Sequence, residues 1–262
     1  MPLSNSKDLK LAVLIDADNV PYSNVKGMME EIAKFGTPTT KRIYADWTRP
    51  NANGWKAVLL EHAITPVQQY SYTTGKNSSD SALIIDAMDL LYTGKVDGFC
   101  IVSSDSDFTR LAIRLRESGM KVIGIGEKKT PASLIAACDR FIFLEVLDGA
   151  IQKSPKKIAA GTLKPAGKPI EKPAEKVYSK IDEPTIELIE STIEAIGDED
   201  GWAFLGDVGN LIVRKKPEFD PRNFGFAKLT PMLKSLTDIL EIDERTSENR
   251  NIKHVYVRLR FS

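Results

Sequence analysis

The chain has 262 residues, which suffices for one large or two modest domains, and its hydrophobic content of 42% and charged content of 27% are typical of a globular protein. Two cysteines within apolar stretches and two isolated histidines argue against a zinc site and against a Ser-His-Asp triad. The sequence has no apolar run long enough to span a membrane and no signal-peptide core near its beginning, so we expect a cytoplasmic protein without a membrane contact.

The charges are unevenly distributed, although 36 basic and 36 acidic residues cancel. Residues 1–150 carry 17 basic and 18 acidic residues, residues 151–180 carry 8 and 2, and residues 181–262 carry 11 and 16. The middle segment is rich in Lys, Pro, Ala and Gly and lacks apolar periodicity, which indicates a linker. The predicted boundaries are 10–147 for a first domain, 148–181 for the linker and 182–260 for a second domain.

Short apolar runs alternate with helical periodicity through the first predicted domain. The run Leu11-Ala-Val-Leu-Ile15 is continuously apolar, as expected of a parallel strand buried on both faces. The alternation predicts an α/β fold, in which helices flank a parallel sheet on both faces. The expected strands are 11–15, 41–45, 64–69, 98–103, 121–126 and 140–144, and the expected helices are 22–35, 53–62, 80–92, 106–118 and 132–137.

Helical periodicity resumes after the linker. A stripe of isoleucines predicts a helix at 186–196, and further helices are expected at 205–213 and 229–236. Residues 240–243 and 254–261 alternate in the manner of a β-hairpin. Three helices followed by a hairpin predict a small winged-helix domain.

Pairs of aspartates follow two of the predicted strands. Asp16 and Asp18 follow the first strand, and Asp105 and Asp107 follow the fourth. In an open α/β sheet the carboxyl ends of parallel strands face one crevice, where ligands bind. Two acidic strand ends that open into one crevice would form a site for a hard divalent cation, Mg²⁺ or Mn²⁺.

A structural alternative is that Asp105 or Ser104 caps the following helix and that Asp18 and Asn19 form a turn. One carboxylate suffices for a cap, so the doubling of the acids favours a metal site.

A further acid is expected at the start of the helix at 80–92. Asp80 and Asp86 are six residues apart, about 600° of helical rotation, so they point in different directions. Asp80 is nearer to the expected crevice and is the better candidate ligand.

Loops expected at the crevice mix aromatic residues with cations, as sites for single-stranded nucleic acid do. Arg49 and Lys76 are the preferred phosphate contacts, and Lys128 and Lys129 could extend the same track. Trp55 begins an apolar helical stripe, so we expect its indole in the core.

A family resemblance rests on the segments Ile15-Asp-Ala-Asp-Asn19, Tyr44-Ala-Asp-Trp47, Gly75-Lys-Asn-Ser-Ser-Asp80, Asp86-Ala-Met-Asp-Leu90 and Ser103-Ser-Asp-Ser-Asp-Phe108. With them, residues 10–147 closely resemble the NYN family of PIN-like nuclease domains, in its LabA-like branch. The resemblance implies a PIN-like sheet, a divalent metal and cleavage of RNA phosphodiester bonds. By position, the implied catalytic and metal-binding acids are Asp16, Asp80, Asp105 and Asp107, and the candidate substrate-binding residues are Asn19, Ser104, Lys76 and Arg49.

The second domain resembles a LOTUS (OST-HTH) domain through Gly201-Trp-Ala203, the helix at 205–213 and Phe224-Gly-Phe-Ala-Lys-Leu229. This resemblance implies binding of RNA, including structured or G-rich RNA, or recruitment of a protein partner. The acidic balance of residues 181–262 weakens a role on the RNA backbone. A local basic patch could still form from Arg214, Lys215, Lys216, Arg222 and Lys228.

The sequence therefore predicts a metal-dependent endoribonuclease that cleaves single-stranded RNA and carries a C-terminal module for RNA or a protein partner. The alternative is a catalytically silent RNA-binding or regulatory adaptor. A third, weaker hypothesis is a phosphatase of the haloacid-dehalogenase type, because Asp16 and Asp18 imitate its paired aspartates. That pattern usually continues with Gly-Thr, whereas Asn19-Val20-Pro21 follows here.

Overall fold

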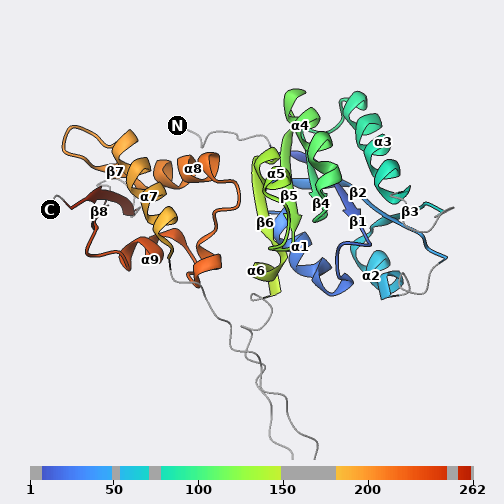
Figure 1. The fold of residues 1–262 in the computed structure, drawn as a ribbon, viewed down its shortest axis with the longest axis horizontal. Helices are drawn as coiled ribbons and strands as arrows, with labels where there is room; N and C mark the ends of the chain where they lie inside the picture. The colour runs from blue at the N-terminus through green and yellow to red at the C-terminus, as the bar shows by residue number, and fades with distance from the viewer. Residues whose placement is uncertain (1–7, 49–53, 71–77, 149–180, 247–252, 261–262) are drawn as a thin grey trace, which may run out of the picture.

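The computed structural model describes residues 8–48, 54–70, 78–148, 181–246 and 253–260. Figure 1 shows a larger α/β part, drawn in blue to yellow-green, and a smaller C-terminal part, drawn in orange to red. The predicted linker at 148–181 falls almost entirely outside the described residues. No helix within the described ranges is both long and apolar enough to cross a membrane.

The larger part is built on a sheet in which every paired strand runs parallel to its neighbours. Its strands are β1 (Lys10–Asp16), β2 (Thr37–Ala45), β3 (Thr65–Gln68), β4 (Gly98–Val102), β5 (Lys121–Gly126) and β6 (Arg140–Phe143). Their order across the sheet is β3-β2-β1-β4-β5-β6. The chain therefore builds outward from β1 in one direction, then crosses back to place β4 on the other side of β1.

Helices cover both faces of this sheet, as the alternation of elements predicts (Figure 1). The helical elements are η1 (Tyr22–Asn24), α1 (Val25–Ile32), α2 (Trp55–His62), α3 (Ser78–Thr93), η3 (Ser106–Phe108), α4 (Thr109–Glu117), α5 (Ala132–Ala137) and α6 (Leu144–Asp148). Side chains of α1, α2 and α6 pack with Leu11, Val13 and Ile15 on one face. Those of α3, α4 and α5 pack with Ala12 and Leu14 on the other. Alternate residues of β1 thus serve two cores, which explains why the whole run is apolar.

The C-terminal part has the helices and the hairpin that the sequence predicts, with a core of its own. Its elements are α7 (Glu183–Ile196), β7 (Ala203–Phe204), α8 (Leu205–Lys215), η5 (Pro221–Phe224), α9 (Leu229–Lys234), β8 (Leu240–Thr246) and β9 (Lys253–Leu259). The hairpin strands β8 and β9 pair antiparallel, and the short β7 adds to β9, so the sheet order is β7-β9-β8. The fold class is therefore confirmed as a PIN-like α/β domain with a small winged-helix domain.

The two domains contact each other along β6, an edge strand of the large sheet. The N–H of Phe141 donates a hydrogen bond of 3.0 Å to the carbonyl oxygen of Pro217. The guanidinium of Arg140 binds the carbonyl oxygen of Phe219 and lies 3.1 Å from the carboxylate of Asp220. The segment between α8 and η5 thereby covers a strand edge that would otherwise present an unpaired N–H group.

The structure adds elements that the periodicity does not predict. The last predicted strand, 140–144, ends one residue earlier, and α6 begins at Leu144. The predicted helix at 22–35 is shorter, because the 3₁₀ turn η1 precedes α1 and the helix ends at Ile32. The strand β7 and the 3₁₀ helix η5 are too short to produce a periodic pattern.

Candidate metal centre

The acidic strand ends meet where the strand order of the sheet reverses. Strands β1 and β4 are neighbours, with Ile15 paired to Val102, so Asp16 and Ser103 emerge side by side at their carboxyl ends. Chain connections leave β1 and β4 toward opposite sides of the sheet, which opens a crevice at this point. The order of the strands thus places the predicted aspartates at the usual ligand-binding position of an open α/β sheet.

Asp16 is buried, with an exposed fraction of 1%. Its Oδ2 accepts hydrogen bonds from the amide of Asn19 at 2.6 Å and from the hydroxyl of Ser103 at 2.9 Å. Its Oδ1 accepts one from the N–H of Asp18 at 3.2 Å. Since each carboxylate oxygen has two lone-pair positions, Oδ2 is saturated and Oδ1 retains one acceptor position.

Asp105 and Asp107 are positioned by the turn that starts η3. Asp105 is the N-cap of this 3₁₀ helix, and its carboxylate accepts the N–H of Asp107 at 2.9 Å. The N–H of Asp105 in turn donates to the hydroxyl of Ser103 at 3.1 Å. The helix-cap alternative is therefore present in the structure. The cap engages Oδ1 of Asp105, so one carboxylate of the pair accounts for it.

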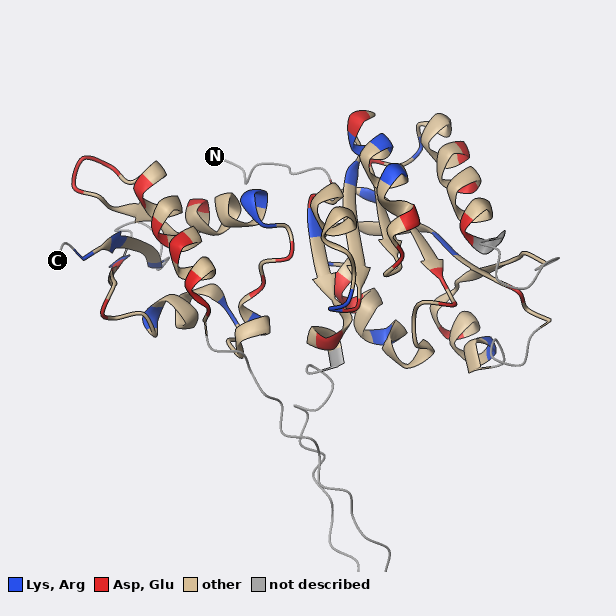
Figure 2. Ribbon diagram, in the orientation of Figure 1, with Lys and Arg blue, Asp and Glu red and all other residues tan. Residues whose placement is uncertain are grey.

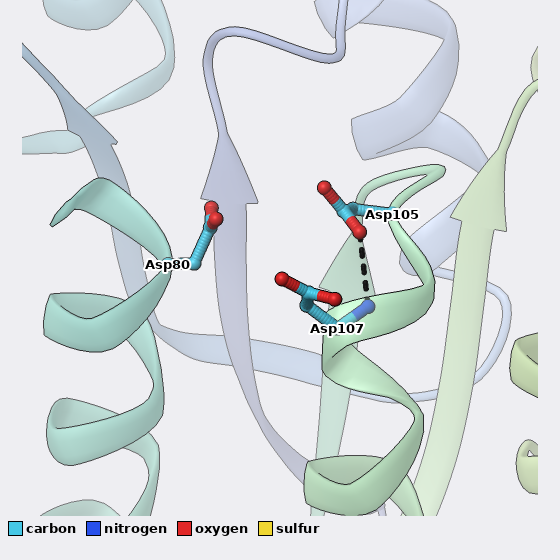
Figure 3. A group of neighbouring side chains, drawn as sticks. All are labelled: Asp80, Asp105 and Asp107. Carbon is cyan, nitrogen blue, oxygen red and sulfur yellow. Dashed lines mark hydrogen bonds between the residues drawn. The ribbon is translucent and has the colours of Figure 1, made fainter. Parts of the chain in front are cut away.

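Asp80 comes from the first turn of α3 and completes a group of three carboxylates (Figure 3). Asp80, Asp105 and Asp107 each offer one oxygen, and these oxygens all lie within 4.8 Å of one another. Packing of α3 over β1 and β2 carries Asp80 to the crevice from a distant part of the sequence. Asp16 does not belong to this group of three, although its charge acts on Asp80.

The electrostatics of the site are unfavourable without a cation. Burial, followed by the charges of Asp16, Asp105 and Asp107, raises the pKa of Asp80 to about 6. Burial also raises the pKa of Asp16, although the hydrogen bonds from Asn19 and Ser103 offset part of this effect. Carboxylates held close together at neutral pH therefore repel one another.

The donor set matches a hard divalent cation. Carboxylate oxygens are the ligands that Mg²⁺ prefers, at about 2.1 Å, so two oxygens on opposite sides of one ion lie about 4.2 Å apart. The three oxygens lie within 4.8 Å of one another and would need only small side-chain movements to share an ion. Burial is the largest cause of the raised pKa of Asp80, and a divalent charge would offset the further rise that the neighbouring carboxylates cause.

The other predicted site residues have separate positions. Asp86 hydrogen bonds to Arg42 and to the phenol of Tyr44, on the part of α3 that faces β2, away from the three carboxylates. Asp18 is exposed, and only its backbone contacts Asp16. The hydroxyl of Ser104 accepts the N–H of Glu127 at 2.8 Å and so joins the η3 loop to the end of β5. As an acceptor in this bond, Ser104 keeps its own proton to donate.

The predicted phosphate contacts Arg49 and Lys76 lie outside the described residues. Trp55 is in the core, 3% exposed, as its helical stripe predicts. Lys128 and Lys129 are exposed after β5, at the same end of the sheet as the carboxylates, and Lys129 pairs with Glu127 at 2.6 Å.

Ser103 is the site residue that the sequence does not single out. Its hydroxyl accepts from the backbone of Asp105 and donates to Asp16, so it connects both acidic strand ends. Ser103 directly follows a buried strand, and the neighbouring strand ends in an aspartate. This position indicates a role in the site only when the strand order is known.

Fold and site together define a PIN-like α/β domain with an acidic centre at the switch point of its sheet. The family model described as "NYN domain" matches residues 10–145, which is more than half of the chain, and the chain therefore belongs to the NYN domain family. The match is consistent with the LabA-like branch and does not specify it. The family model described as "OST-HTH/LOTUS domain" matches residues 176–252. The two domain families to which the sequence shows a resemblance, NYN and LOTUS (OST-HTH), are thus confirmed.

Several solved structures are similar to parts of the chain. A protein of unknown function from Vibrio parahaemolyticus is 21% identical, with a TM-score of 0.44, and the match covers 53% of this chain and 94% of that one. An uncharacterized protein from Nitrosomonas europaea is 27% identical, with a TM-score of 0.30 and coverage of 38% and 94%. A protein fragment from Chromobacterium violaceum is 37% identical, with a TM-score of 0.26 and coverage of 33% and 90%. No curated protein matches the chain.

The raised pKa of Asp80 predicts that this carboxylate destabilises the metal-free protein at neutral pH. Because the folded pKa of about 6 exceeds the ordinary value of 3.8, the free energy of unfolding falls as pH rises between these values. We expect Asp80→Asn to raise the free energy of unfolding at pH 7.5 by about 1 kcal/mol, less than the ~3 kcal/mol of the full shift because water screens the site.

Urea unfolding in EDTA measures this gain, which should disappear below about pH 4. Asp89→Asn, an exposed change on the same helix, is the matched control. Adding Mg²⁺ should stabilise the wild type more than Asp80→Asn. If Asp80→Asn is less stable than the wild type in EDTA, repulsion between the carboxylates does not destabilise the metal-free protein.

Proposed function

We propose that the protein is a metal-dependent endoribonuclease that cleaves single-stranded RNA and acts in the cytoplasm. The observation that carries this proposal is the convergence of Asp80, Asp105 and Asp107 within 4.8 Å at the switch point of an NYN domain. NYN membership supports a nuclease-type activity, and the OST-HTH/LOTUS match supports RNA binding by the C-terminal domain.

The chain's own residues have separable roles in this mechanism. Asp80, Asp105 and Asp107 would hold Mg²⁺ or Mn²⁺. Such an ion, when bound, supplies charge for the scissile phosphate and lowers the pKa of water. The carboxylate of Asp16 accepts one amide N–H of Asn19 and so fixes this side chain, which leaves the second amide N–H of Asn19 to contact a phosphate oxygen.

The adaptor alternative retains one supporting observation. Glutamates line α7, visible as red segments along this helix in Figure 2, and they are Glu183, Glu187, Glu190 and Glu194. A surface of this kind repels RNA and would suit a basic protein partner. RNA binding that is unaffected by metal, without any cleavage product, would favour the adaptor.

The phosphatase hypothesis gains no support from the geometry. Its nucleophile would be Asp16, whose carboxylate is buried and already accepts three hydrogen bonds. Asp18, the required partner acid, is exposed and points its backbone rather than its carboxylate to Asp16.

Titration of Mn²⁺ or Mg²⁺ into the full chain with a labelled single-stranded RNA tests the nuclease. We expect products from the wild type only with metal, and a rate at least ~100-fold lower for Asp105→Asn, more than an outer-shell change usually costs. The asparagine can still accept the N–H of Asp107 through its carbonyl oxygen, so the turn should survive.

Asp89→Asn, an exposed change of the same type, should leave the rate unchanged. Cleavage that needs no metal and survives in Asp105→Asn would point to a contaminating nuclease and would reject the proposal.

A further inference from the structure

A groove of about 770 Å³ lies between the two domains. Its walls are the residues at the end of α1 and at the start of β5 and β6 on one side, and α8 with the η5–α9 segment on the other. Two of its lining residues are acids, Asp139 and Asp220. Six are cations: Lys34, Lys121, Arg140, Arg214, Arg222 and Lys228. Six cations against two acids give the groove a positive lining.

Both walls are held in place by the contact between the domains. Arg222 donates two hydrogen bonds of 2.9 Å to the buried carboxylate of Glu31 on α1 and also binds Asp220 at 2.7 Å. Asp220 in turn pairs with Arg140 of β6 at 3.1 Å. This chain of four charged groups, which we call the interdomain ion cluster, fixes α1 and β6 against the C-terminal domain.

The cations of the groove fall into two sets. Arg140 and Arg222 are occupied by the interdomain ion cluster, and Lys34 pairs with Glu31 at 2.6 Å. Arg214 and Lys228 are exposed, and within the described ranges neither side chain forms an ion pair. They line one wall. On the other wall lies Lys121, which is exposed and forms a long ion pair, 3.8 Å from its Nζ to the carboxylate of Asp139.

We propose that this groove is a composite binding site for the phosphate backbone of single-stranded RNA, formed only when the two domains are docked. Cations on two opposed walls match a polyanion that passes between them. Figure 2 shows blue segments at the end of α8 and at the start of β6, toward the space between the domains. The choice of RNA over an acidic peptide rests on the proposed function.

The groove is separate from the metal centre. Lys121 begins β5 and lines the groove, whereas Gly126 ends β5 near the carboxylates. At roughly 3.3 Å per strand residue, the two ends of β5 are about 17 Å apart. Groove contacts thus hold a part of the RNA that is remote from the reacting phosphate. We expect them to lower KM and to leave kcat almost unchanged.

The test measures binding of a labelled oligouridine to the full chain in EDTA, where metal-dependent cleavage does not contribute. The double variant Arg214→Ala/Lys228→Ala should bind about tenfold more weakly, and the slope of log affinity against log salt should become shallower by about 1.4, as two lost phosphate contacts require. Lys121→Ala, on the other wall, should weaken binding in the same direction.

The matched control is Arg114→Ala/Lys95→Ala, which removes the same two side-chain types from exposed positions outside the groove. Equal losses in both double variants, an unchanged affinity in the groove variant, or no binding by the wild type would overturn the proposal. A specific loss of binding in a protein without metal-dependent cleavage would sustain the groove and reject the nuclease.

Discussion

Asp16→Ala is expected to lower the rate of RNA cleavage at least ~1000-fold, or about 4 kcal/mol of transition-state stabilisation. The physical reason is that Asp16 joins both halves of the site. It holds Asn19 directly, and through Ser103 it holds the backbone of Asp105. Without the carboxylate, three donors lose their acceptor, and the loops that carry Asn19 and Asp105 are released. Metal-dependent cleavage of a labelled RNA by the purified full chain is the measurement.

Ser103→Ala separates the direct hold of Asp16 on Asn19 from its hold on Asp105 through Ser103. This change keeps the carboxylate and removes only the bridge to Asp105, so we expect a 10–100-fold loss, the usual cost of an outer-shell partner. If Ser103→Ala is as inactive as Asp16→Ala, then Asp16 acts only by positioning. Full activity in Asp16→Ala would contradict any role of the buried carboxylate.

The elements of the NYN domain could be predicted because each carries a local signal. Leu11 to Ile15 serves two cores, so all five residues must be apolar, and this signature is visible without any tertiary information. The order of the strands leaves no such trace. That β4 returns to the far side of β1 follows from packing of the whole sheet, and it is this order that brings Asp16 and Asp105 together.

Part of the candidate site could be predicted from the sequence for the same reason. A doubled acid after a buried strand is anomalous, because one aspartate suffices for a cap, and this marks Asp105 and Asp107. Asp80 has a weaker signal, its place at the start of a helix expected near the crevice, and the family motif then adds it to the acidic set. Ser103 lies in the motif 103–108, but the sequence assigns it no role of its own, because its importance depends on a hydrogen bond to a residue 87 positions away.

The contact between the domains cannot be predicted from any local sequence pattern. Glu31 and Arg222 are 191 residues apart, and in the sequence each resembles an ordinary surface charge. In the structure both carboxylates of the interdomain ion cluster are buried, with exposed fractions of 6% for Glu31 and 5% for Asp220. A buried carboxylate requires a partner, but the requirement becomes visible only when burial is known.

Asp220→Asn is expected to weaken the docking of the two domains by about 3 kcal/mol, the lower end of the cost of breaking a buried ion pair. The change leaves Arg140, a largely buried side chain, with one charged partner fewer and an adjacent like charge in Arg222. An asparagine oxygen can still accept the N–H of Arg222, so the cap of η5 is preserved. An increased radius of gyration in X-ray solution scattering would report the separation, and Asp238→Asn, an exposed change in the same domain, is the control.

Acid should reproduce the effect of this substitution. Burial raises the pKa of Asp220 and of Glu31, but the hydrogen bonds and charge of Arg222 outweigh it, so both values are lowered in the folded protein. Groups with lowered pKa values stabilise the docked state fully above their ordinary values, near pH 4, and this contribution is lost as pH falls below them. We therefore expect wild-type scattering to approach that of Asp220→Asn on acidification below about pH 4.

If both domains form the groove, then changes that weaken docking also weaken RNA binding, and a combination of variants tests this link. In the Asp220→Asn background, Arg214→Ala/Lys228→Ala should lose much of its effect on RNA affinity, because the opposed wall is no longer in place. Strictly additive losses, together with an unchanged radius of gyration, would show that the C-terminal domain binds RNA without being docked on β6. The interdomain ion cluster would then be a contact without influence on the bound RNA.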